Sequence, residues 1–100
     1  MPRYACKRDA NHDLIASTFR AHGIDWIDTW QHAQYTPGFP DGIAVYGPVV
    51  RFIEVKAHEK AMLTQDEALF RSLYADVYRV VATVEEACAM AEEMRRGSDA

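Results

Sequence analysis

The sequence predicts an α/β domain in which helices cover a mixed sheet, with the element order α-β-β-β-α-β-α. Three observations lead to this prediction. The chain has one hundred residues of ordinary globular composition, enough for one domain over residues 1–100 with a core at about 8–96. Helical spacing of apolar residues occurs near both ends, and short runs rich in β-branched and aromatic residues lie between them.

The first element is expected to be a helix that begins near Asp9, because aspartate caps helix N-termini. Gly23 is expected to end the helix, since glycine readily adopts the left-handed conformation. Between these limits, apolar and small side chains recur on one helical face, namely Leu14, Ile15, Thr18 and Phe19.

Three strands are expected next. Residues 24–29 form the first, and residues 30–39 are expected to be a loop, because Pro37 and Gly38 disfavour regular structure. Residues 40–46 and 50–56 then form a β-hairpin around Gly47-Pro48.

The second half contains two helices and one strand. Thr64 with Glu67 and Thr83 with Glu86 have capping-box spacing, which predicts helix starts at both places. The first of these helices extends to about residue 73, and the second is expected to end at Gly97. Residues 77–82, between them, form a buried strand.

Charge and cysteine content narrow the function classes. The formal net charge of −4 argues against a generic basic nucleic-acid binder, although Arg3, Lys7 and Arg8 form a local basic cluster. Cys6 and Cys88 show no zinc-binding spacing and are expected to be free thiols. No apolar signal segment or run of about 20 apolar residues is present, so a soluble cytoplasmic protein without membrane contact is expected.

The predicted hairpin carries the chemically informative residues. A turn centred between Gly47 and Pro48 places Asp41 opposite Glu54. Alternation along the second strand puts Lys56 on the same face. Four apolar side chains further along this face are expected to enter the core, namely Ile43, Val45, Val50 and Phe52.

Two facing carboxylates repel each other, and a hard divalent cation with oxygen ligands is the usual compensation. Magnesium or manganese held by Asp41 and Glu54, with Lys56 beside the cation, fits hydrolysis of a phosphodiester. The structural alternative is that Asp41 is a strand-start residue and that Glu54 and Lys56 are exposed on an edge strand, where charge prevents aggregation.

The segment GFPDGIAVYGPVVRFIEVK resembles the core of the VRR-NUC group of the PD-(D/E)XK nuclease superfamily. The resemblance continues in LTQDEALF, in VYRVVATVEEA and in the opening RDANHDLIASTFRAHG, so that it spans about residues 8–91. It implies a restriction-endonuclease-like fold and a magnesium- or manganese-dependent deoxyribonuclease. Stand-alone members are often phage or bacterial proteins, and some act as homodimers on branched DNA such as Holliday junctions.

Carried over by this resemblance, Asp41 and Glu54 are metal ligands helped by the backbone carbonyl of Val55, and Lys56 is the catalytic lysine. The chain departs from the group at two places. Leu14 stands where the group often has a glutamate, and Glu67 stands where it has a glutamine. The auxiliary candidates are the neighbours of these positions and one basic residue, namely Asn11, Asp13, Gln65, Glu67 and Arg8.

Several other residues have a plainer explanation. The capping box accounts for Glu67, and the four histidines share no metal-binding spacing and are expected at the surface or at helix caps. Trp30, Gln31 and Tyr35 lie in the loop before Pro40, where an aromatic side chain can contact a base. Besides the nuclease, two functions stay open: a weak or inactive member of the fold that binds DNA or protein, and an unrelated α/β interaction module.

Overall fold

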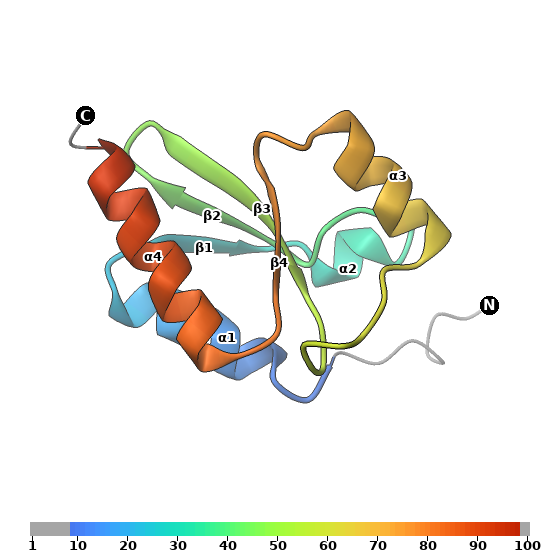
Figure 1. The fold of residues 1–100 in the computed structure, drawn as a ribbon, viewed down its shortest axis with the longest axis horizontal. Coiled ribbons are helices and arrows are strands. Elements are labelled where there is room, and N and C mark those ends of the chain that lie inside the picture. Colours follow the sequence, from blue (N-terminus) through green and yellow to red (C-terminus); the bar gives the residue numbers. More distant parts are fainter. Residues whose placement is uncertain (1–8, 99–100) are drawn as a thin grey trace.

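A four-stranded mixed sheet forms the centre of this computed structural model, which describes residues 9–98 (Figure 1). Strands β1 (Asp25–Asp28), β2 (Gly42–Tyr46) and β3 (Val49–Val55) are antiparallel neighbours in this order. Strand β4 (Tyr78–Val81) lies at the far edge and runs parallel to β3. The prediction of a mixed sheet accompanied by helices is therefore confirmed, and the domain is of the α+β type.

Four helices accompany the sheet in the described part of the chain. Helices α1 (His12–Ala21) and α4 (Val84–Ser98) pack on each other and on the strands, whereas α3 (Gln65–Leu73) lies apart from them (Figure 1). The short helix α2 (Trp30–Ala33) was not expected, because residues 30–39 were predicted to be a loop. The Asp28 carboxylate accepts a hydrogen bond from the Trp30 N–H at 3.2 Å, which favours this extra turn. Within residues 9–98, no helix has the length and apolar character needed to span a bilayer.

Hydrogen bonds at the helix ends confirm most of the predicted boundaries. Thr64 and Glu67 form the expected capping box at α3, and Thr83 and Glu86 exchange the same pair of bonds at α4. Gly23 has the expected positive φ of 78° after α1.

Two predicted helix ends are wrong. Asp9 does not cap α1: the helix begins three residues later at His12, and the Asp9 backbone carbonyl accepts the His12 N–H. Gly97 does not end α4, which continues to Ser98.

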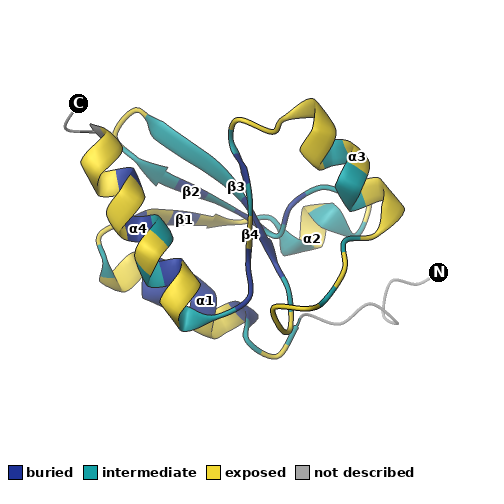
Figure 2. Ribbon diagram, in the orientation of Figure 1, coloured by how far each residue is buried: buried dark blue, intermediate teal, exposed yellow. Residues whose placement is uncertain are grey.

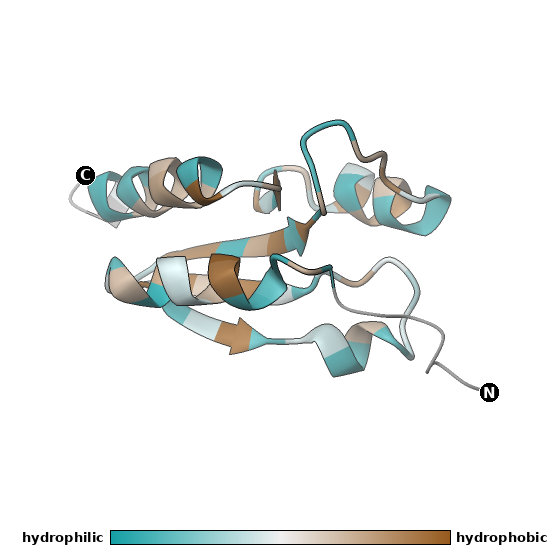
Figure 3. Ribbon diagram, turned by 90° about the horizontal axis from the view of Figure 1, so that it is seen from below, coloured by the Kyte–Doolittle hydropathy of each residue, from teal (hydrophilic) through white to brown (hydrophobic). Residues whose placement is uncertain are grey.

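The main core lies between α1, α4 and the face of the sheet that carries Ile53 and Val55. Figure 2 shows buried segments on the strands and on the inner sides of these two helices. Figure 3 shows that the helices alternate between hydrophilic and hydrophobic segments, as expected when only one side is covered. Leu14, predicted on the buried face of the first helix, is instead 56% exposed.

The four apolar hairpin residues predicted to enter this core do not do so. Because Ile53 and Val55 face α1 and α4, alternation turns the other set to the opposite face, where each is only partly buried. That set comprises Ile43, Val45, Val50 and Phe52.

Aromatic contacts hold α3 against this second face of the sheet. The Phe70 ring of α3 lies 5.7 Å from Phe52 of β3 and 5.9 Å from Tyr78 of β4, centroid to centroid. Phe39, from the segment before β2, lies 5.6 Å from Phe70 on another side. The helix has no fully buried residue, and this aromatic cluster connects it to the sheet.

Two isoleucine substitutions test the position of the core. Ile53→Ala removes a side chain with no exposed surface and should lower the free energy of unfolding by about 2–5 kcal/mol. Ile27→Ala, on a strand residue that is 53% exposed, is the matched control and should cost less than about 1 kcal/mol. Urea denaturation of both variants measures the difference. Equal losses would contradict the assignment of the core to the α1–α4 face.

Candidate active site

The candidate site lies at one end of the sheet, where several chain segments meet. Strand β3 ends there with Glu54 and Val55, and Lys56 follows directly. Strand β4 runs parallel to β3 and ends at the same place. Asp41 directly precedes β2, and the N-termini of α1 and α3 approach the same end through Asn11 and Glu67. Residues far apart in the sequence therefore surround one small region.

The hairpin has the predicted register. Ile43 pairs with Phe52 and Val45 with Val50, so continuation by two residues brings Asp41 opposite Glu54. The Asp41 N–H donates to the Ile53 carbonyl at 3.0 Å, and an Asp41 carboxylate oxygen accepts the Val55 N–H at 2.9 Å. The Asp41 side chain is thus fixed against the backbone of the strand that carries Glu54.

A close packing contact fixes the position of Asp41 further. The next residue, Gly42, lies directly under the Trp26 ring, and a β-carbon there would come within 2.1 Å of the ring. Glycine at this position allows β2 to start close to β1, immediately after the acid.

Glu54 is a buried acid, with 4% of its surface exposed. Burial, followed by the nearby charges of Asp41 and Glu67, raises the Glu54 pKa from 4.5 to about 10. Burial also raises the Asp41 pKa. One Glu54 oxygen, Oε1, is buried and has no hydrogen-bond partner among residues 9–98. Such an oxygen costs free energy and is available as a ligand for a cation.

The Lys56 ammonium lies between the carboxyl groups of Glu54 and Glu67. Its Nζ donates to Glu67 Oε1 at 2.6 Å and lies 3.8 Å from Glu54 Oε2. Burial opposes the lysine charge, but the hydrogen bond and the charge of Glu67 outweigh it and raise the Lys56 pKa. In the same way, burial opposes the Glu67 charge, while bonds from Lys56 and the Thr64 N–H lower the Glu67 pKa. These two residues form a charged pair.

Glu67 therefore has two roles, of which the capping box was the only one given by sequence spacing. The same oxygen, Oε1, accepts the Thr64 N–H at 2.9 Å and the Lys56 ammonium. The sequence signal for the second role was only indirect, namely that Glu67 occupies a position that the resemblance links to the site.

The remaining auxiliary candidates are placed differently. The Asn11 side chain reaches the end of β3, whereas Asp13 is exposed in the first turn of α1 and Gln65 is exposed in the first turn of α3. Arg8, together with Arg3, Lys7 and Cys6, lies outside the described residues. Cys88 is a free, partly buried thiol.

A buried histidine beside the site was missed in the sequence. His12, expected at the surface or at a cap, is 1% exposed, and its Nε2 lies 2.7 Å from an Asp28 oxygen. The Trp26 indole N–H donates to the same oxygen at 3.2 Å. Although burial opposes its charge, these bonds lower the Asp28 pKa. Alternation along β1 was a usable signal, because it puts Asp28 on the face of Trp26, where an acid needs a partner.

The residues present fit a divalent cation held mainly by two carboxylates. Asp41 and Glu54 supply acid oxygens, one of them without a partner, and Val55 lies between Glu54 and Lys56 with its carbonyl as a further oxygen. Over residues 9–98, no group of three or more His, Cys, Asp or Glu side chains is arranged to hold a metal ion. This ligand set suits magnesium, which keeps several of its waters, better than a closed structural site.

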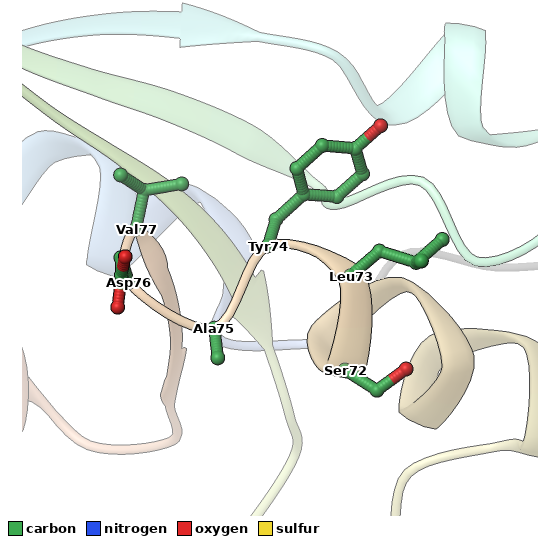
Figure 4. Close-up of a pocket in the computed structure, with 6 residues that line it drawn as sticks. All are labelled: Ser72, Leu73, Tyr74, Ala75, Asp76 and Val77. Atoms are coloured by element: carbon green, nitrogen blue, oxygen red, sulfur yellow. The ribbon is translucent and has the colours of Figure 1, made fainter.

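A cavity of about 390 Å³ opens beside the acids, between residues 33–39 and the start of α3. Asp41, Thr64 and Glu67 are among its lining residues, so it gives access to the candidate site. A second hollow, of about 360 Å³, is lined by residues 72–77 after α3 (Figure 4). All of its lining residues come from this one segment, and Asp76 is the only charged residue among them, so it brings no catalytic groups together.

Comparison of the chain with known protein families, with curated proteins and with solved structures found no match in any of the three.

Substitution of Glu54 tests its protonation state. In the unfolded chain this carboxyl ionises near pH 4.5, but in the folded chain only near pH 10. Between these values the folded state binds the extra proton, so the free energy of unfolding should fall as pH rises, by at most about 1.4 kcal/mol per pH unit. Glu54→Gln should reduce this slope between pH 5 and 9 in urea denaturation.

Glu93→Gln, at an exposed glutamate on α4, is the matched control and should keep the slope of the original chain. A Glu54→Gln slope equal to that of the original chain would show that Glu54 does not retain its proton in the folded state.

Substitution of Gly38 tests the packing between the loop before Asp41 and α3. Gly38 has φ of 84°, and a β-carbon there would lie 2.3 Å from the Asp66 backbone oxygen. We expect Gly38→Ala to destabilise the fold by about 1–3 kcal/mol. Gly97→Ala within α4 meets only an ordinary contact at 3.7 Å and should be neutral or stabilising by up to about 1 kcal/mol. Thermal denaturation separates the two, and a neutral Gly38→Ala would contradict this packing.

Proposed function

We propose that the protein is a metal-dependent endonuclease that hydrolyses phosphodiester bonds in DNA, with Mg²⁺ or Mn²⁺ as cofactor. The observation that carries the proposal is that Asp41 lies opposite the buried Glu54, with Lys56 on the same face at one end of the sheet. An edge strand that used these charges only to prevent aggregation would expose them to solvent. Glu54 is instead buried, and β3 is an inner strand of the sheet.

The electrostatics of the two acids support a cation site. Without a cation, burial and mutual repulsion keep a proton on Glu54. A divalent cation would replace that proton and use the unpaired Oε1. When bound, Mg²⁺ or Mn²⁺ supplies Lewis acidity toward the phosphate and lowers the pKa of water.

The side chains of the site have distinct parts in the proposed reaction. Asp41 and Glu54 hold the cation. The Lys56 ammonium, held by Glu67, is placed to donate to a phosphate oxygen and to stabilise the negative charge that develops there. The cavity beside Asp41 and Glu67 gives the scissile strand room to approach.

The resemblance to the VRR-NUC group extends the proposal to a restriction-endonuclease-like core, to branched DNA as substrate and to a homodimer. A DNA substrate is compatible with the net charge of −4, because a bound divalent cation reverses the local sign of the potential.

A second candidate function is a weak or inactive member of the same fold that binds DNA or protein. Two observations favour it. The exposed Leu14 replaces the first-helix glutamate of the group, and the Lys56 ammonium is already engaged by Glu67. Cleavage of DNA by the original chain and by variants that lack the Asp41 carboxylate or the Lys56 ammonium distinguishes the two functions.

The decisive experiment uses a labelled four-way DNA junction and a matched linear duplex, in Mg²⁺ or Mn²⁺. The original chain should cut in a metal-dependent way, and Lys56→Ala should slow cutting by roughly 100-fold or more, because it removes the charge beside the phosphate. Asp41→Asn should abolish both cutting and Mn²⁺ binding measured by calorimetry. Lys60→Ala, at an exposed lysine four residues from Lys56, is the matched control and should cut normally.

Tight junction binding by the original chain without any cutting would favour the second candidate. Cutting that survives in both Lys56→Ala and Asp41→Asn would contradict the assignment of the active site.

A further inference from the structure

Asn11 forms an unusual link between the first helix and the ends of two strands. It stands at the N-cap position of α1, but its side chain makes no hydrogen bond to the helix. Its Nδ2 instead donates to the Lys56 carbonyl at 2.9 Å and to the Ala82 carbonyl at 2.7 Å. These two carbonyls belong to the residues that directly follow β3 and β4.

The orientation of the amide follows from its partners. Both acceptors are carbonyl oxygens, so exchanging the amide nitrogen and oxygen would set an oxygen against two oxygens. The Asn11 Oδ1 is buried, and no group in the described part of the chain hydrogen-bonds to it. The side chain therefore keeps its two donor contacts despite an unsatisfied buried acceptor, which is costly.

An asparagine amide is well suited to this position. A group with two N–H donors satisfies two carbonyls where the parallel pairing of β3 and β4 ends, after the Lys56 N–H bond to Val81 O at 3.0 Å. Aspartate has the same shape as asparagine but no donor when ionised, and alanine lacks the polar group altogether.

The contact bears directly on the catalytic strand. Lys56 carries both the carbonyl held by Asn11 and the ammonium held by Glu67, so its backbone and its side-chain end are fixed separately. Loss of the carbonyl contact would free the backbone at the residue whose Nζ lies 3.8 Å from Glu54.

We propose that Asn11 is a positioning residue: it fixes the backbone of Lys56 through its carbonyl and thereby places the lysine ammonium for the reaction. Asn11 acts through Lys56 and is not a ligand of the metal. This inference rests on the proposed nuclease function.

The test compares Asn11→Ala, Lys56→Ala and the double variant in single-turnover cleavage of the junction at saturating DNA. Asn11→Ala should slow cleavage by about tenfold to 100-fold, because misplacement of a catalytic group by about 1 Å can slow a reaction by roughly 100-fold. The Mn²⁺ dissociation constant should change less than about twofold, because Asp41 and Glu54 are untouched. The double variant should be no slower than Lys56→Ala alone.

A double variant slowed by the product of the two single effects, or an Asn11→Ala variant as fast as the original chain, would overturn the proposal. Asn11→Asp retains the size of the side chain and should be as slow as Asn11→Ala. Ser17→Ala, at an exposed residue of α1, is the control for non-specific effects and should leave the rate unchanged.

Nuclear magnetic resonance of the metal-free protein gives a readout that does not depend on activity. The Lys56 side-chain carbon signals should shift in Asn11→Ala and stay in place in Ser17→Ala. If the original chain does not cut but the Lys56 signals shift as expected, the proposed nuclease function fails while the positioning contact stands. Unchanged Lys56 signals in Asn11→Ala would show that Asn11 does not position the lysine.

Discussion

The register of the β2–β3 hairpin is the constraint on which the candidate site depends. It brings Asp41 opposite Glu54 and sends Lys56 to the same face, and a shift by one residue would turn Glu54 and Lys56 into the α1–α4 core. The apolar residues of β3 stabilise this register, because Ile53 and Val55 must face that core. Packing on one face of the strand thus determines which charges appear on the other.

The cost of burying acids explains much of the structure around the hairpin. Glu54 has little access to water and remains protonated over a wide pH range, while Glu67 neutralises the Lys56 ammonium nearby. Hydrogen bonds from the backbone and from Asn11 fix the surrounding strand ends. Within the described residues, one oxygen of this region, Glu54 Oε1, lacks a hydrogen-bond partner, which is consistent with the proposed cation site.

The two faces of the sheet serve different purposes. One is covered by α1 and α4 and contains the fully buried apolar residues. The other is covered only in part, by α3 and its aromatic cluster around Phe70. Because Glu67 lies in the first turn of α3, the stability of this smaller cluster affects the position of Glu67, the ion-pair partner of Lys56. The site therefore combines residues next to β3, which packs on the main core, with Glu67 from α3, which has no fully buried residue.

The local features could be predicted from the amino-acid sequence: the capping boxes at Thr64 and Thr83, the hairpin turn after Tyr46 and the face shared by Asp41, Glu54 and Lys56. These depend on spacing within a few residues or on one turn, so one chain segment contains the whole signal. Packing between distant segments selected the face of the sheet that becomes the main core. It also decided the burial of His12 against Asp28, the pairing of Lys56 with Glu67, and the reach of Asn11 to Lys56 and Ala82. Those contacts join segments up to 71 residues apart, and their partners are selected by packing in three dimensions, which no local spacing encodes.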